Sequence, residues 1–175
     1  MTGKAGRAVI AFAVAVVAVL STGCTARAQM AYSIQDVGTS VKQVSAVMLS
    51  CQKATKDTAY VESAQWTVNA MLRADLAKLA AADKNIAYDN NALLQLLTSG
   101  DLGGQGQAMT KDPLCSDLAV GLALDALVST QLGVSTYAEH IKTYKLVVNP
   151  RFGTWNPSTG TLDGSGSLSQ AASGK

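Results

Sequence analysis

The sequence predicts a mainly α domain of about five helices, with a small two-stranded sheet joining its N- and C-terminal ends. Three observations support this fold class. Apolar residues recur at three- and four-residue steps along most of the chain, which is the period of a helix. Runs suited to strands lie near both ends, at Met30–Ile34 and Lys145–Val148, and turn-forming residues separate the helical stretches. The 175 residues, 48% of them hydrophobic, suffice for a single domain.

Three helices are expected in the first half of this domain. The first covers about residues 36–56, and its apolar stripe contains Val37, Val41, Val44, Met48 and Cys51. The second covers about residues 61–83 and stops at Asn85, because Asn tolerates a left-handed helix end. Its inward residues are Val68, Met71, Leu72, Leu76, Leu79 and Ala80. The third runs from a cap at Asp89 to Thr98 and buries Leu93, Leu94, Leu96 and Leu97.

Two more helices are expected after a glycine-rich loop at residues 99–107. Asp112 and Pro113 favour a helix start, with Asp as the cap and Pro at the first helical position. Thr136 and Glu139 have capping-box spacing and predict a short helix ending near residue 143. Asp117 and Asp125 lie two turns apart and are expected on a solvated face. Residues 156–175 are rich in Gly, Ser and Thr, which favours a flexible tail.

The first 23 residues have the three parts of a secretory signal. Lys4 and Arg7 form a basic start, an apolar run follows over residues 8–20, and Ser21-Thr22-Gly23 is a small-residue exit. The apolar run has about 13 residues, whereas a permanent transmembrane helix needs about 20. The sequence therefore favours a cleaved signal over a membrane-spanning helix.

The residues Leu20-Ser21-Thr22-Gly23-Cys24 resemble the lipobox of bacterial lipoproteins. In that family, cleavage before the cysteine is coupled to diacylation of its sulfur, although Leu usually lies one position closer to the cysteine than Leu20 does. The resemblance implies that Cys24 carries a palmitate-type lipid anchor, with residues 24–29 as the lipidated tether. The expected location is the extracytoplasmic face of the cell membrane, and the membrane is then the first partner.

Cys51 and Cys115 are the two cysteines left after Cys24, and in an oxidising compartment an even pair favours a disulfide. Closing a loop of about 65 residues would stabilise the fold by roughly 4 kcal/mol. The alternative is a pair of buried thiols that act as small hydrophobic residues. A redox-active pair is disfavoured because the two residues lack Cys-x-x-Cys spacing.

Charge and composition exclude several classes of partner. Removing residues 1–23 removes Lys4 and Arg7 from the 14 basic residues, which leaves 12 against 12 acidic residues. No basic stripe is left to bind a phosphate backbone, so nucleic acid is not expected as a partner. His140 is the single histidine, which disfavours a multi-ligand metal site, and no cofactor is expected.

The segment Lys145-Leu146-Val147-Val148-Asn149-Pro150-Arg151-Phe152-Gly153-Thr154-Trp155 resembles the closing signature of the SurA-like N-terminal domain in actinobacterial lipoproteins. That signature is a valine-rich strand, then Val-Asn-Pro-Arg, an aromatic residue, Gly, a variable residue and Trp. The signature positions here are Val148, Asn149, Pro150, Arg151, Phe152, Gly153 and Trp155. The opening segment Tyr32-Ser33-Ile34-Gln35-Asp36-Val37 is similar to that family's short first strand, so the resemblance spans residues 30–155.

This resemblance implies a helical chaperone-like domain that receives unfolded exported chains in a groove or on an apolar face. It does not imply prolyl isomerase activity, because no parvulin domain follows. Met48 and Met71 could line such a groove or pack in the core, and Phe152 and Trp155 could contact a client or pack on the helices.

Two functions follow as expectations. The first is a lipid-anchored extracytoplasmic protein with a chaperone-like domain for unfolded or exported polypeptides. The alternative is an envelope lipoprotein that serves as a structural or partner-specific interaction module. Neither is an enzyme, because the sequence contains no Gly-x-Ser-x-Gly elbow and no His-Glu-x-x-His motif. The sequence predicts neither the identity of the client nor the oligomeric state.

Overall fold

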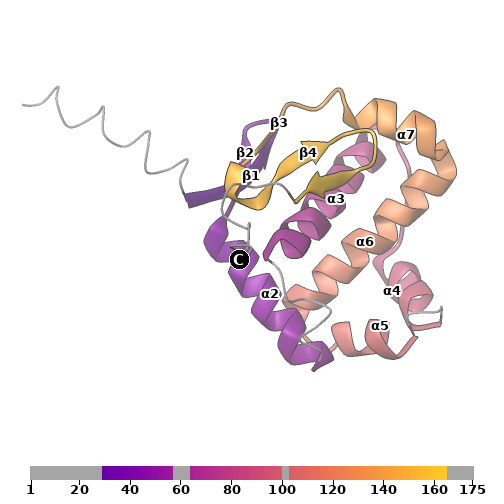
Figure 1. Ribbon diagram of the computed structural model, residues 1–175. Coiled ribbons are helices and arrows are strands. Elements are labelled where there is room, and N and C mark those ends of the chain that lie inside the picture. Colours follow the sequence, from indigo (N-terminus) through magenta and orange to yellow (C-terminus); the bar gives the residue numbers. More distant parts are fainter. Residues whose placement is uncertain (1–28, 57–63, 100–102, 165–175) are drawn as a thin grey trace, which may run out of the picture.

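The computed structural model describes residues 29–56, 64–99 and 103–164, and within them it has the expected mainly α fold. These residues form six helices and two small antiparallel sheets. The sheets lie at one end of the helical bundle, and α4 and α5 lie at the opposite end (Figure 1). The helices are α2 (Val41–Thr55), α3 (Ala64–Asp83), α4 (Asn90–Ser99), α5 (Gly103–Met109), α6 (Pro113–Leu132) and α7 (Val134–Ile141). The strands are β1 (Met30–Ile34), β2 (Val37–Ser40), β3 (Leu146–Val148), β4 (Thr154–Asn156) and β5 (Thr161–Asp163), with a 3-10 helix, η3 (Pro150–Phe152), before β4.

The first sheet has the order β2-β1-β3, with both pairings antiparallel. Ser33 of β1 faces Val147 of β3 and Gly38 of β2. The predicted pairing between the two ends of the domain is therefore confirmed, and β2 is a third strand that the sequence interpretation missed.

The first helix begins at Val41 and not at Asp36, because the chain reverses before it. Gln35 and Asp36 both have left-handed backbone conformations, with φ of 51° and 68°, and connect β1 to β2 in a two-residue hairpin. Val37 consequently lies in a strand and is 76% exposed, outside the predicted apolar stripe. Ser40 starts the helix through a capping box with Gln43, whose side chain accepts a hydrogen bond from the Ser40 backbone N–H at 2.8 Å.

The helix α6 is the centre of the bundle and packs against α2, α3, α4, α5 and α7. By length and composition alone it could cross a membrane. Its buried residues Leu118, Leu124 and Val128 instead lie in the protein core, so within the described residues it is the central helix of the domain.

The ends of α3 and α6 follow the sequence signals. Asn85 adopts a left-handed conformation with φ of 53°, and the backbone N–H of Ile86 donates to the Ala81 carbonyl at 2.8 Å. This is the predicted left-handed stop, with Ile86 packed against the core. Asp112 caps α6 by accepting a hydrogen bond from the Leu114 N–H at 3.1 Å, and Pro113 is the first helical residue.

Two connections differ from the sequence interpretation. Part of the expected loop at residues 99–107 forms α5, and Gly106 allows α5 to touch α4: a Cβ there would lie 2.2 Å from the Leu97 carbonyl oxygen. The last helix begins at Val134 after Gly133, whose φ of 79° suits glycine. Thr136 is therefore inside α7, and the predicted capping box with Glu139 does not form.

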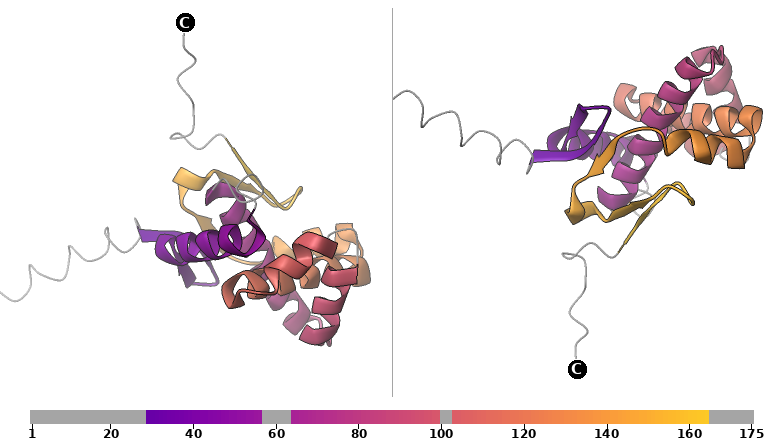
Figure 2. Two further views of the ribbon diagram at one scale, coloured as in Figure 1. Left: turned by 90° about the horizontal axis from the view of Figure 1, so that it is seen from below. Right: turned by 90° about the horizontal axis from the view of Figure 1, so that it is seen from above.

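The ordered structure continues past Trp155, which corrects the expected start of a flexible tail at residue 156. β4 and β5 form a hairpin in which Trp155 faces Leu162. The Leu162 backbone N–H donates to the Asn69 Oδ1 of α3 at 2.9 Å, so the hairpin is attached to the helices. Figure 2 shows the hairpin on one side of the helical body. The expected flexibility of residues 165–175 lies outside the described residues.

Two apolar clusters form the core. The larger joins the strands to α3, the middle of α6 and α7, and includes Phe152. The smaller lies between α2, α3 and the first half of α6, around Cys51 and Cys115. A cavity opens beside this smaller cluster.

Candidate functional site

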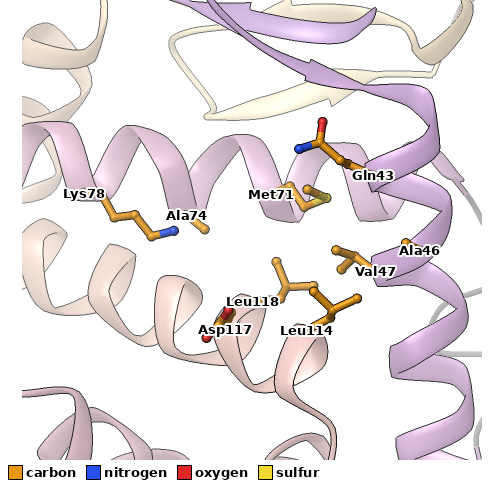
Figure 3. A pocket seen from close by; sticks show the side chains of 9 residues that line it. All are labelled: Gln43, Ala46, Val47, Met71, Ala74, Lys78, Leu114, Asp117 and Leu118. Atoms are coloured by element: carbon orange, nitrogen blue, oxygen red, sulfur yellow. The ribbon is translucent and has the colours of Figure 1, made fainter. Parts of the chain in front are cut away.

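An open cavity of about 250 Å³ lies between α2, α3 and the first turns of α6 (Figure 3). We call it the α2–α3–α6 groove. Each helix contributes three residues to its lining: Gln43, Ala46 and Val47 from α2, Met71, Ala74 and Lys78 from α3, and Leu114, Asp117 and Leu118 from α6. Because the residues of each helix are spaced at three or four positions, they share one helical face.

The lining is apolar in the middle and polar at its ends. Figure 3 shows Met71 directed into the space between the helices, with Lys78 and Gln43 toward opposite ends. Leu114 is 46% exposed although it is a large apolar residue, so this wall of the groove is open to solvent. The groove can therefore accept apolar side chains, with charged groups at its margin.

The small residues Ala74 and Gly121 set the spacing of α3 and α6 next to the groove. A Cβ on Gly121 of α6 would lie 2.4 Å from the Ala74 Cβ of α3, so these helices approach as closely as glycine permits. Ala74 also lines the groove. The distance between α3 and α6 at this point therefore depends on Gly121, which has no side chain.

Two connections hold α2 against α6 near the groove. Cys51 and Cys115, the predicted pair, are bonded to each other, and both are fully buried. The hydroxyl of Ser50, the residue before Cys51, donates a hydrogen bond to Asp112 Oδ1. That hydrogen bond, followed by backbone N–H donors at the helix start, lowers the pKa of the Asp112 carboxyl from its ordinary value.

A second apolar cavity of about 270 Å³ adjoins the groove at Lys78 of α3 and lies against β1 and β2. Lys78 lines both cavities, and Val37 and Leu79 contribute to the second. The Tyr32 hydroxyl donates to Asp75 Oδ2 at 2.6 Å, and burial, together with this carboxylate, raises the pKa of the Tyr32 phenol. Lys78 thus lies at the boundary between two apolar surfaces.

The sequence interpretation located part of this groove. Met71 lines it, whereas Met48 packs against the smaller core cluster and is not among its lining residues. The α6 lining residues Leu114, Asp117 and Leu118 are not predicted as cavity residues by the sequence. The spacing of apolar residues defines a helix face, but it does not reveal where three such faces leave a gap. Cys24, the predicted lipidation site, lies outside the described residues.

The signature residues after β3 close the domain onto its first strand. The Asn149 backbone N–H donates to the Ala31 carbonyl at 2.8 Å, and its side-chain Nδ2 donates to the Met30 carbonyl at 2.9 Å. Its Oδ1 accepts from the Arg151 N–H at 3.2 Å, which caps η3. A single asparagine therefore joins β1 to the start of η3.

Three further signature residues, Phe152, Gly153 and Trp155, pack inside the domain. Phe152 is buried in the larger cluster, and Trp155 packs against it. Gly153 has a φ of 116°, and a Cβ there would lie 2.3 Å from the Asp163 carbonyl oxygen. These contacts favour the packing alternative over client contact for Phe152 and Trp155.

Asp125 is not on a solvated face, which corrects the sequence interpretation. It is only 3% exposed, and it accepts hydrogen bonds from Arg73 and from the Tyr137 hydroxyl, the latter at 2.8 Å. Asp117, two turns earlier, is exposed as expected. Periodicity did not separate the two carboxylates because the partners of Asp125 lie on α3 and α7. Within the described ranges, no group of three His, Cys, Asp or Glu side chains could hold a metal ion.

The chain has no detectable relative in any of three comparisons: no protein-family model matches it, and no curated protein or solved structure does. The resemblance to SurA-like domains consequently rests on the signature residues and on the short first strand.

Proposed function

We propose that the chain is a lipid-anchored extracytoplasmic protein whose domain binds unfolded or exported polypeptides in the α2–α3–α6 groove. The observation that carries this proposal is the open apolar lining, in which Met71 and Leu118 lie beside the exposed Leu114. Methionine is unbranched and polarizable, so it adapts to different apolar side chains. Such a lining suits a site that accepts many sequences.

The volume of the groove limits what it can hold. A cavity of about 150 Å³ accepts benzene, so one of about 250 Å³ accommodates one large apolar side chain or two smaller ones. An extended polypeptide would place such side chains in the groove and leave its backbone at the open face. Lys78 and Asp117 at the margin would contact its polar groups.

Export and anchoring are part of the same proposal. The signal-like residues 1–23 and Cys24 support them from the sequence. The Cys51–Cys115 disulfide supports export from the fold, because disulfides persist mainly outside the cytoplasm. An anchored domain of this kind would meet polypeptides as they leave the membrane.

Photo-crosslinking from the groove tests the binding site. A photoreactive amino acid replaces Leu114 in the full chain, in phospholipid nanodiscs, and a permanently unfolded secreted protein is added. The control places it at Leu49, which is 61% exposed on α2 and does not line the groove. We expect strong crosslinking from position 114 and little from position 49. Equal yields from both positions would contradict the proposed site.

A partner-specific interaction module is the second candidate, and the limited size of the groove favours it. A site for one or two side chains, with Lys78 and Asp117 at its margin, also suits a short motif of a single partner. Crosslinking of several unrelated unfolded proteins with similar yields supports the chaperone-like function. Crosslinking of none of them, with one envelope protein captured in cells, supports the second candidate.

A further inference from the structure

A separate cavity of about 140 Å³ lies beneath the turn between β4 and β5, against α6 and α7. Arg73 and Asp125 are its charged lining residues, and Tyr137, Trp155, Ser129 and Thr159 are among the others. Arg73 is two positions from Met71 and therefore points to the opposite side of α3 from the groove. The cavity has no part in the proposed polypeptide site.

Buried partners hold the Arg73 guanidinium in place. Its Nε donates to Asp125 Oδ2 at 3.0 Å, and its Nη2 contacts the same oxygen. The other carboxylate oxygen, Oδ1, accepts from the Tyr137 hydroxyl at 2.8 Å. Asp125 is 3% exposed, so both of its oxygens are committed inside the protein. The carboxylate and the phenol thus act as positioning groups for the arginine.

The guanidinium keeps donors that these contacts do not use. Arginine has five N–H donors, and the contacts to Asp125 engage two of its nitrogens. Among the residues that the structure describes, Asp125 is the hydrogen-bond partner of the Arg73 side chain, which is 43% exposed. The remaining donors are therefore accessible at a cavity whose walls already fix the arginine.

The rest of the cavity suits a small ligand with one polar end. Trp155 supplies an aromatic wall, and Ser129 and Ser158 supply hydroxyl groups. The volume is close to that of a cavity that accepts benzene, about 150 Å³. It therefore has room for a carboxylate group and one small side chain, and the remainder of a longer ligand would stay outside.

We propose that this cavity binds a carboxylate group, from a polypeptide C-terminus or a small organic acid, through the guanidinium of Arg73. The planar fork of arginine donors matches the two oxygens of a carboxylate. A phosphate dianion is disfavoured because Asp125 already shares the single positive charge. A neutral carbonyl oxygen would accept a hydrogen bond from the guanidinium but would lack both the opposite charge and the second oxygen of a bidentate pair.

The indole N–H NMR signals of the full chain in nanodiscs test this proposal. The chain has two tryptophans, and Trp155 lines the cavity whereas Trp66 packs in the smaller core cluster. The probes are acetate, inorganic phosphate, N-acetyl-alanyl-alanine and the C-terminal amide of that peptide. We expect the acid peptide to shift the Trp155 signal saturably. The amide should bind at least about tenfold more weakly than the acid peptide. The Trp66 signal serves as the internal reference.

Variants separate the arginine from general effects. Arg73→Gln removes the positive charge and part of the set of N–H donors. It should weaken binding of the acid peptide about tenfold or more. Arg73→Lys keeps the positive charge but lacks the planar pair of donors. Its affinity for the acid peptide should lie between those of the unchanged chain and Arg73→Gln. Lys84→Gln, an exposed position just after α3 that lines neither this cavity nor the groove, should bind like the unchanged chain. The comparison of acid with amide needs no substitution, so it holds even if Arg73→Gln fails to fold.

The outcomes are distinct. Binding of the acid peptide but not of acetate identifies a polypeptide C-terminus, and equal binding of both identifies a small acid. Equal affinity for acid and amide, tighter binding of phosphate, or no shift of Trp155 would each overturn the proposal. None of these outcomes depends on the α2–α3–α6 groove, so this proposal can fail while the proposed function stands.

Discussion

Gly121 of α6 packs directly on Ala74 of α3, where any larger residue at position 121 would collide with the Ala74 methyl group. This contact fixes the spacing of the two helices that form the base of the α2–α3–α6 groove. The shape of the groove thus follows from a pair of small residues, and the stability of the fold and the width of the site are linked at this point.

Gly121→Ala should destabilise the domain by about 1–3 kcal/mol, because the added methyl forces α3 and α6 apart. Chemical denaturation followed by circular dichroism measures the effect as a lower midpoint. Combining it with Ala74→Gly removes the opposing methyl and should recover part of the loss. A loss that is the same with or without Ala74→Gly would show that this contact does not set the spacing.

Removing the disulfide by Cys51→Ala and Cys115→Ala should cost roughly 4 kcal/mol. The bond closes a loop with a sequence separation of 64 residues, and its loss restores the freedom of the unfolded chain. Because α2 is one wall of the groove, crosslinking from position 114 should decrease in this variant. Dithiothreitol should lower the stability of the unchanged chain and leave the variant unaffected. An unaltered denaturation midpoint would contradict this role.

The buried tyrosines should make the domain unstable in alkali. Burial and the neighbouring carboxylates raise the pKa of Tyr32, Tyr137 and Tyr144 above the ordinary value of 10.0. The folded state therefore keeps protons that the unfolded chain loses. This contribution is complete below pH 10 and is lost progressively as the pH rises above it.

Tyr32→Phe isolates one of these groups. It removes the hydrogen bond to Asp75 and should cost about 1 kcal/mol at neutral pH. It should also reduce the decline in unfolding free energy between neutral pH and strongly alkaline pH, measured by denaturant titration. Tyr88, which is 43% exposed, provides the matched control as Tyr88→Phe. Identical alkaline profiles for Tyr32→Phe and the unchanged chain would rule out this effect.

If the anchoring proposal holds, Cys24→Ser should release the chain from the membrane, because the proposal assigns the lipid to the Cys24 thiol. Cell fractionation followed by mass spectrometry checks this expectation. The unchanged chain should appear in the membrane fraction, beginning at Cys24 with added acyl mass. The variant should lack that mass and leave the membrane fraction. An unchanged chain that retains residues 1–23 and carries no lipid would contradict the anchoring proposal.

Much of the fold could be predicted because its signals are local. The left-handed stop at Asn85 and the cap at Asp112 each depend on neighbours within a few residues, and both are present. The start of α2 has a local signal of the same kind, because Ser40 and Gln43 have capping-box spacing.

The features missed by the sequence interpretation depend on contacts between distant segments. Asp125 is buried because Arg73 and Tyr137 reach it from α3 and α7, and nothing near Asp125 in the sequence indicates these partners. The groove likewise results from three helix faces that meet without filling the space between them. Helical periodicity identified Met71 as a candidate, but only the packing of α2 and α6 places it in an open site.

The most direct test of polypeptide binding in the groove uses the methionine methyl NMR signals of the full chain in nanodiscs. The chain has five methionines, of which Met71 lines the groove and Met30 lies in β1. An unfolded leucine-rich peptide is titrated, with a serine-substituted peptide as the control. The account predicts a saturable shift of the Met71 signal with the leucine-rich peptide and no shift of Met30. Binding of that peptide with an unmoved Met71 signal would contradict it.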